Sequence, residues 1–272
     1  MPREMIVTKL ADLKPAVPAA SPLTVPEPWL VIGDVHFHSR LIVGIEQYTS
    51  VELVADVLAA GGCDVFITTF DLSHERPSLM LSDLDRVMGL DHFIWIGTTS
   101  FARSMEEALA TARVLRSTFG INIMKLDVRP AHNLPDNAQT VQAARKLVQE
   151  GFAVLPFISP DPDTAVALQD AGCAALRVLA SPVGSYRGID DAPTVRNVID
   201  AVSIPTVVEG GIGTPAHVMS AVELGADAVL VNTAVAQAAD PPRMAAAMRH
   251  AVLSAQYARD CANPLTVAYL DC

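Results

Sequence analysis

Ile121-Asn122-Ile123-Met124-Lys125-Leu126-Asp127-Val128 is a mostly apolar stretch that carries a lysine and an aspartate. Its apolar residues, and the proline and turn-forming residues after it, predict a buried β-strand. Lys125 and Asp127 share one face of that strand because side chains alternate with a period of two residues. One interpretation is an edge strand with a solvated ion pair. The other is a lysine projecting into an enclosed site, where desolvation favours a neutral, nucleophilic amine.

The composition narrows the class of protein. The chain has 272 residues, a length typical of an α/β barrel, and 51% of them are hydrophobic. Its formal net charge of -11 argues against nucleic acid or an anionic membrane surface as a partner. No apolar run approaches the roughly 18 residues of a membrane span. The N-terminal segment lacks the apolar core of a signal peptide, so we expect a cytoplasmic protein.

The metal-ligating residue types show no metal-site spacing. Cys63, Cys173, Cys261 and Cys272 include no CxxC pair, and the first two follow glycines at predicted helix-to-strand junctions, where small buried residues are common. His36 and His38 are two residues apart, but no third ligand follows nearby, which favours packing on a hairpin over metal binding. We therefore expect neither a metal nor a cofactor.

Outward from the Lys125 strand, strands and helices alternate along the chain. Eight strands are predicted, at 41–44, 64–70, 93–97, 121–128, 153–158, 174–179, 205–209 and 228–231. Each precedes a helical segment, at 51–60, 79–90, 104–119, 138–150, 163–171, 192–202, 215–224 and 241–260. This alternation predicts a (β/α)8 TIM barrel as a single domain over 29–260, entered through a hairpin at 29–37. Residues 1–28 are expected to form a flexible arm and 261–272 a tail.

Active sites of such barrels lie at the C-terminal ends of the strands. Residues at those ends are Lys125 and Asp127 on the fourth strand, Glu209 on the seventh, and Asn232-Thr233 on the eighth. Arg177, in the middle of the sixth strand, has two open interpretations: an interior partner for a carboxylate, or a structural residue near the bottom of the barrel.

Two loops are candidate phosphate sites. The first is the glycine loop after the seventh strand, Glu209-Gly210-Gly211-Ile212-Gly213-Thr214-Pro215, which opens a helix and is followed by Asn232 and Thr233 after the eighth strand. Glycines let backbone amides approach an anion, and free amides at a helix start bind phosphate. A plain tight turn is the alternative. The second is the loop 180–188, where Gly184 and Ser185 are candidates and a loop without function is the alternative.

Taken together, these residues indicate a site for a phosphorylated carbonyl compound. Lys125 would form an imine with the carbonyl carbon, Asp127 and Glu209 would move protons, and the loop amides would hold the phosphate.

From about Trp29 to Tyr257 the sequence resembles the thiazole synthases of thiamin biosynthesis. The segments that carry the resemblance are 39–44 (SRLIVG), 124–128 (MKLDV), 134–136 (LPD), 150–156 (EGFAVLP), 172–175 (GCAA), 205–215 (PTVVEGGIGTP) and 223–234 (ELGADAVLVNTA). The resemblance implies a Lys125 imine with a ketose phosphate and sulfur from the C-terminal Gly-Gly thiocarboxylate of a ubiquitin-like carrier protein. It also favours a homo-oligomer and assigns the phosphate to the amides around residues 211–214 and the Asn232-Thr233 turn.

The sequence also departs from that family. Asp127 stands where the family usually carries glutamate, and Glu209 where it carries aspartate; the loop 68–76 and the segment after Asp260 do not match. Because the lysine is retained and the two acids are altered, we hypothesise that the chain is a 2-thiosugar synthase-like paralogue of secondary metabolism. Its substrate would be a hexose 6-phosphate such as glucose 6-phosphate. The alternatives are thiazole formation from 1-deoxy-D-xylulose 5-phosphate, a non-catalytic protein that binds phosphosugar or carrier, and an imine-forming aldolase. The loops after strands two and six are the expected carrier-docking sites.

Overall fold

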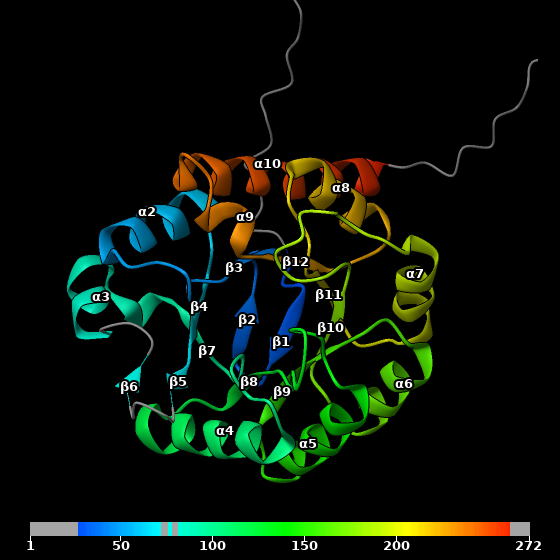
Figure 1. The fold of residues 1–272 in the computed structure, drawn as a ribbon. Helices are drawn as coiled ribbons and strands as arrows, with labels where there is room; N and C mark the ends of the chain where they lie inside the picture. The colour runs from blue at the N-terminus through cyan, green and yellow to red at the C-terminus, as the bar shows by residue number, and fades with distance from the viewer. Residues whose placement is uncertain (1–26, 72–75, 78–80, 262–272) are drawn as a thin grey trace, which may run out of the picture.

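A parallel sheet of eight strands, rolled into a nearly closed barrel, forms the centre of the computed structural model (Figure 1). The structure describes residues 27–71, 76–77 and 81–261. The order in the sheet is β3-β12-β11-β10-β9-β8-β7-β4. The strands are β3 (Leu41–Val43), β4 (Val65–Thr68), β7 (Ile94–Thr98), β8 (Ile123–Leu126), β9 (Ala153–Ile158), β10 (Leu176–Leu179), β11 (Thr206–Glu209) and β12 (Ala228–Val231). The predicted TIM barrel is confirmed.

Helices surround the sheet and alternate with its strands (Figure 1). They are α2 (Val51–Gly61), α3 (Leu81–Met88), α4 (Met105–Phe119), α5 (Asn137–Gln149), α6 (Pro162–Asp170), α7 (Ala192–Ala201), α8 (Pro215–Glu223) and α10 (Pro241–Cys261), with the short α9 (Thr233–Ala236) and a 3-10 turn at Leu90–His92. Many of these helices have an N-cap residue whose side chain accepts a hydrogen bond from a backbone N–H of the first turn. These N-cap residues are Ser50, Ser104, Asp136, Asp161, Asp191 and Thr214.

The second predicted strand differs from expectation. Instead of one strand over 64–70, β4 ends at Thr68, and β5 (Phe70–Asp71) pairs with β6 (Arg76–Pro77) in a separate antiparallel ribbon. Residues 72–75 and 78–80, which belong to or follow the loop expected to help dock the carrier, lie outside the described residues. The same holds for residues 1–26 of the predicted arm and for 262–272 of the predicted tail; Cys261 is the last residue of α10.

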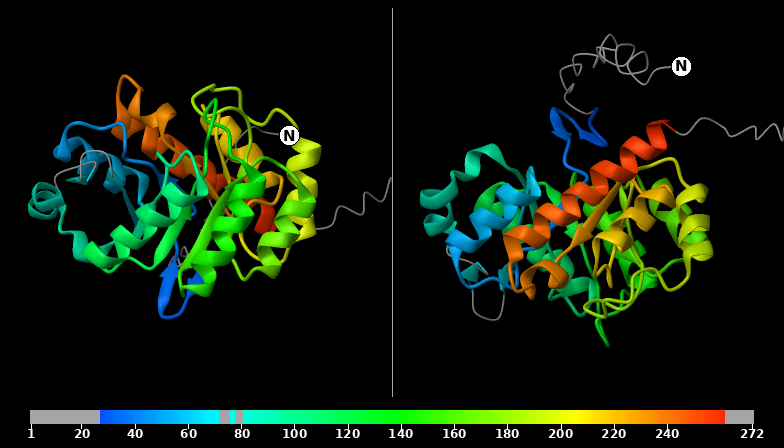
Figure 2. Two further views of the ribbon diagram at one scale, coloured as in Figure 1. Left: turned by 60° about the horizontal axis from the view of Figure 1, so that its bottom comes forward. Right: turned by 90° about the horizontal axis from the view of Figure 1, so that it is seen from above.

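An N-terminal hairpin closes one end of the barrel. Strands β1 (Leu30–Ile32) and β2 (Val35–Phe37) pair as predicted, and Trp29, Leu30 and Phe37 pack against inward-facing residues of the barrel strands: Ile42, Val65, Ile67, Ile96, Ile123, Leu155 and Val207. Figure 2 shows the hairpin projecting from one end, opposite the loops that follow β8 and β10. Because this end is filled with apolar side chains, an accessible site must lie at the other end, where the strands terminate.

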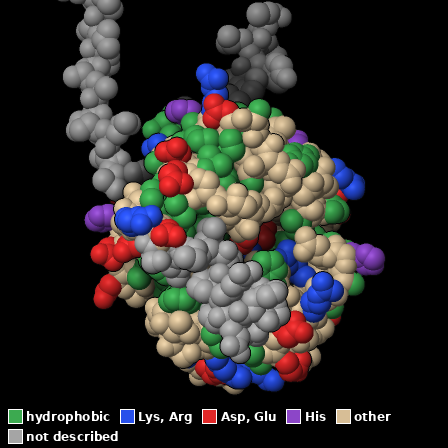
Figure 3. Space-filling model, turned by 60° about the vertical axis from the view of Figure 1, so that its left-hand side comes forward, with side chains coloured by type: hydrophobic (Ala, Val, Ile, Leu, Met, Phe, Trp, Pro, Cys, Tyr) green, Lys and Arg blue, Asp and Glu red, His purple; other side chains and the backbone are tan. Residues whose placement is uncertain are grey.

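One face of the molecule carries mixed charge. On the face seen in Figure 3, acidic and basic side chains are interspersed with apolar and polar ones. None of the helices in the described part of the chain combines the length and apolarity needed to cross a bilayer.

Candidate active site

Lys125 and Asp127 both point into the barrel. β8 lies between β7 and β9, so the edge-strand interpretation is wrong. The side chains of Lys125 and Asp127 are 8% and 1% exposed, and Lys125 Nζ lies 3.1 Å from Asp127 Oδ2. Lys125 Nζ also donates to Ser100 Oγ, at 3.4 Å, from the segment that follows β7. The lysine is thus held in an enclosed site, as the second interpretation predicted.

Arg177 links the two predicted acids. Its side chain is 1% exposed, Nη2 pairs with Asp127 Oδ1, and Nη1 lies 3.3 Å from Glu209 Oε2. Its Nε donates to the backbone oxygen of Leu155 at 2.9 Å, which fixes the plane of the guanidinium. Of the two interpretations of Arg177, the interior partner of a carboxylate is confirmed.

Asp127 is a buried anion surrounded by cations. Burial alone would raise the pKa of Asp127, but the positive charges of Arg177, Lys125 and Arg129 outweigh it and hold that pKa below its usual range. Arg129 Nη2 lies 3.2 Å from Asp127 Oδ2, on the side away from Arg177. Asp127 is therefore ionised at neutral pH and orients Lys125.

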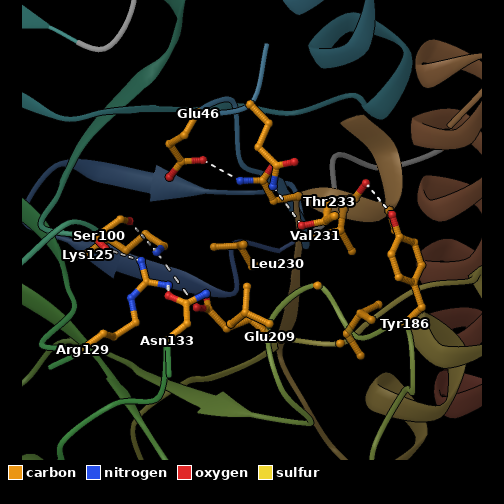
Figure 4. A pocket seen from close by; sticks show the side chains of 18 of the residues that line it. Glu46, Ser100, Lys125, Arg129, Asn133, Tyr186, Glu209, Leu230, Val231 and Thr233 are labelled. Atoms are coloured by element: carbon orange, nitrogen blue, oxygen red, sulfur yellow. Dashed lines mark hydrogen bonds and ion pairs between the residues drawn. The ribbon is translucent and has the colours of Figure 1, made fainter. Parts of the chain in front are cut away.

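Glu209 is the acid that faces open space. A cavity of about 290 Å³ at the C-terminal end of the strands is lined by Lys125, Glu209 and Arg129 (Figure 4). Asp127 is fully buried and does not line it. Glu209 Oε1 is 4.0 Å from Lys125 Nζ. Of the two predicted acids, Glu209 is placed to exchange a proton with a molecule in the cavity.

The predicted phosphate residues divide into two groups. Gly184, Gly210, Gly211, Ile212, Asn232 and Thr233 line the cavity, but Gly213, Thr214 and Ser185 do not. Gly213 N donates to His217 Nδ1 and Thr214 Oγ1 caps α8, while Ser185 Oγ lies 3.1 Å from Ser181 Oγ. Within the described residues, no acceptor is recorded for the backbone amides of Gly211, Ile212, Thr233 and Ala234. These amides are available to an anion in the cavity.

Gly211 is expected to be indispensable for the shape of this loop. Its φ is +64°, and a Cβ there would lie 1.6 Å from Ser181 Oγ. Gly211→Ala should lower the free energy of unfolding by about 1–3 kcal/mol and weaken binding of inorganic phosphate, because strain and collision both displace the loop. Gly151→Ala is the matched control: its φ is +82°, but nothing lies within 4 Å of the added Cβ. Equal urea-unfolding curves and equal phosphate affinities for the two variants would contradict this expectation.

Sequence reasoning missed several residues of the cavity. Glu46, Ser100, Arg129, Asn133 and Tyr186 line it from the ends of β3, β7, β8 and β10. Tyr186 OH donates to the backbone oxygen of Thr233 at 3.1 Å, so the loop 180–188 contacts the eighth-strand turn. Most of them could have been found from their position in the sequence, since they lie within a few residues of the C-terminal end of a predicted strand.

Cys173 behaves as the sequence predicted. It is 4% exposed, and burial raises the pKa of its thiol to about 12. No group of three or more His, Cys, Asp and Glu side chains suited to a metal ion occurs within residues 27–71, 76–77 and 81–261.

Comparison with known proteins identifies the family. A family model described as "Thiazole biosynthesis protein ThiG" matches residues 31–268. The chain belongs to the thiazole synthase family. It is 41% identical over 225 residues to thiazole synthase 2 of Syntrophotalea carbinolica, covering 81% of this chain and 85% of that one. It is 39% identical over 227 residues to the thiazole synthase of Idiomarina loihiensis, covering 82% and 88%. These relatives place the chain among sulfur-transfer enzymes of the thiazole synthase type.

One solved structure is more similar to this chain in sequence than these two relatives are. A chain of the Amycolatopsis orientalis BexX/CysO complex is 58% identical, with a TM-score of 0.84, and the match covers 88% of this chain and 98% of that one. At 16% identity and a TM-score of 0.53, 3-hexulose-6-phosphate synthase from Salmonella typhimurium shares the fold alone. This thiazole synthase homologue is thus more similar to the chain of the BexX/CysO complex than to the two thiazole synthases described above.

Proposed function

We propose that this thiazole synthase homologue forms an imine between Lys125 and a sugar phosphate and then accepts sulfur from a carrier protein. One observation carries the proposal. The Lys125 amine and the Glu209 carboxylate lie at the wall of a single cavity, which the unpaired amides after β11 and β12 also border. A phosphorylated carbonyl compound needs these groups, a nucleophile, a proton acceptor and an anion site, within one molecular length.

The residues divide the chemistry between them. The amine of Lys125 attacks the carbonyl carbon and water leaves, which gives a cationic imine. Glu209 takes the proton from the neighbouring carbon, because an imine acidifies that position and Glu209 is a cavity-wall carboxylate that lies 4.0 Å from the Lys125 amine. Asp127, ionised and paired with Arg177 and Arg129, stabilises the positive charge of the imine.

A hexose 6-phosphate is the proposed substrate and a 2-thiosugar phosphate the product. Loss of the C3 proton from the C2 imine moves the carbonyl to C3 and leaves Lys125 as an amine on C2. The carrier sulfur then forms a bond to C2 as the bond from C2 to Lys125 breaks, and hydrolysis of the resulting thioester releases the carrier as a carboxylate. The support is the exchange of acid lengths relative to the thiazole synthase pattern: Asp127 is the shorter acid on the lysine's own strand, and Glu209 the longer acid from β11. With these lengths both acids still reach Lys125, at 3.1 and 4.0 Å. The higher identity to the chain from the BexX/CysO complex is consistent with a branch separate from thiazole formation.

The proposed sulfur donor is the C-terminal thiocarboxylate of a ubiquitin-like carrier protein. A relative of this chain was solved in the complex named BexX/CysO, and a barrel mouth open at the strand ends gives a flexible Gly-Gly tail access to Lys125. In the described part of the mouth, Tyr186 and Phe101 are exposed large side chains, 41% and 61% accessible, suited to contact a partner. We also propose a cytoplasmic homo-oligomer.

Trapping the imine tests the substrate. Glucose 6-phosphate, fructose 6-phosphate and 1-deoxy-D-xylulose 5-phosphate are offered separately, borohydride is added, and the intact mass is measured. We expect an adduct on Lys125 with a hexose 6-phosphate and none with the pentulose. An adduct from the pentulose alone would instead support thiazole formation.

A non-catalytic protein and an aldolase would each behave differently in this experiment. No adduct with any sugar, when calorimetry shows that the sugars bind, would support a non-catalytic binding protein. Carbon–carbon cleavage without a sulfur donor would support an aldolase.

A further inference from the structure

Glu46 is an acidic side chain at the cavity that the proposed chemistry does not use. It follows β3, and in Figure 4 it lies between the Lys125 side of the cavity and Thr233. We infer that Glu46 is a specificity-determining residue that accepts hydrogen bonds from the hydroxyl groups of the sugar chain between the imine carbon and the phosphate. This inference rests on the proposed function.

A hydrogen bond from Asn232 fixes the position of Glu46. Asn232 Nδ2 donates to Glu46 Oε2 at 2.7 Å. Both side chains pack over Gly44, where an added Cβ would lie 2.6 Å from Asn232 Nδ2 and 2.8 Å from Glu46 Oε2. The end of β3 therefore holds the carboxylate in a defined place at the cavity wall.

Most of the hydrogen-bonding capacity of Glu46 is unused. An ionised carboxylate offers about four acceptor positions. Among the described residues, Asn232 donates to Glu46, and no lysine or arginine side chain forms an ion pair with it. Lys125 and Arg129, the basic side chains that line the cavity within the described part of the chain, both pair with Asp127. A ligand that satisfies Glu46 must therefore bring its own donors.

The negative charge of Glu46 determines which part of the substrate it can bind. A carboxylate repels a phosphate dianion, so Glu46 does not suit the phosphate itself. Hydroxyl groups are uncharged donors, and a hydrogen bond to an ionised acceptor is stronger than one to a neutral acceptor. The unpaired amides of Gly211 and Ile212, on β11's loop, remain for the phosphate.

The same geometry distinguishes the two candidate sugars. A hexose 6-phosphate with its carbonyl at C2, as in fructose 6-phosphate, carries three hydroxyls between the carbonyl carbon and the phosphate, on C3, C4 and C5, whereas 1-deoxy-D-xylulose 5-phosphate carries two there, on C3 and C4. A site built to bind a hydroxyl discriminates strongly against a molecule that lacks it, because its own polar group is left unpaired. Glu46 thus favours the longer polyol.

Glu46→Ala tests this assignment. The concentration of hexose 6-phosphate that gives half-maximal borohydride trapping on Lys125 should rise by about 10- to 100-fold, the scale of a hydrogen bond to a charged group. The half-inhibitory concentration of inorganic phosphate should stay the same or fall, since Glu46 repels phosphate. Glu46→Gln keeps an acceptor for Asn232 but removes the charge, and should give an intermediate rise.

Two controls separate recognition from structure. Glu223→Ala removes an equal charge from the exposed end of α8 and should change neither value. Two results would overturn the assignment while leaving the proposed function intact. One is hexose trapping that is unchanged in Glu46→Ala. The other is a loss of phosphate inhibition as large as the loss of hexose trapping. No hexose adduct in the wild-type protein would overturn the proposed function, and this inference with it.

Discussion

Lys125→Ala is expected to abolish the trapped adduct and to lower product formation by about 10⁴-fold or more, the scale on which removal of an activated nucleophile acts. The reason is positional: Lys125 is the lysine at the cavity wall, with its amine 3.1 Å from Asp127 and 4.0 Å from Glu209. Intact-mass spectrometry measures the adduct. Product formation is followed with a hexose 6-phosphate and the thiocarboxylated carrier.

The fold should tolerate this change. Asp127 keeps Arg177 and Arg129 as partners, so no buried carboxylate is left unpaired. Lys146→Ala, on the exposed side of α5, is the control and should retain full trapping. A borohydride adduct of unchanged yield on the Lys125→Ala protein would refute the imine assignment.

Arg177→Met is expected to be the most destabilising substitution in the barrel interior. It leaves Asp127 and Glu209, 1% and 6% exposed, with one cationic partner fewer each. Breaking a buried pair from one side costs about 3–5 kcal/mol. Urea unfolding measures the loss of stability. The double variant Asp127→Asn, Arg177→Met should recover part of that stability, because the unpaired buried charge of Asp127 is removed.

The effect should depend on pH. Since folding lowers the pKa of Asp127, its ion pairs stabilise the protein above about pH 4 and lose that contribution as the pH falls through the lower, folded value. The difference between wild type and Arg177→Met should therefore shrink in acid. Arg113→Met removes a surface pair with Glu150, of which Arg113 is 55% exposed, and should cost about 1 kcal/mol or less. Equal losses for the two variants would show that burial of Arg177 is unimportant.

The sequence by itself determined the barrel and the pairing of Lys125 with Asp127. Alternating strand and helix patterns specify the fold because each follows from the local period of apolar residues. The shared face of Lys125 and Asp127 follows from the two-residue period of one strand. The position of Gly211 in a loop at a strand end follows from the glycine-rich sequence directly after the seventh strand. Each of these features depends on neighbours along the chain.

Only the tertiary structure decided what these residues contact. Register pairs Leu179 with Glu209 and Arg177 with Val207, which places the guanidinium one layer below the carboxylate that it binds. The same stagger buries Asp127 fully and leaves Glu209 at the cavity wall. The contact between Glu46 and Asn232 joins residues 186 positions apart, and it exists because β3 pairs with β12. Strand stagger and barrel closure set these distances, and no local pattern of residues encodes them.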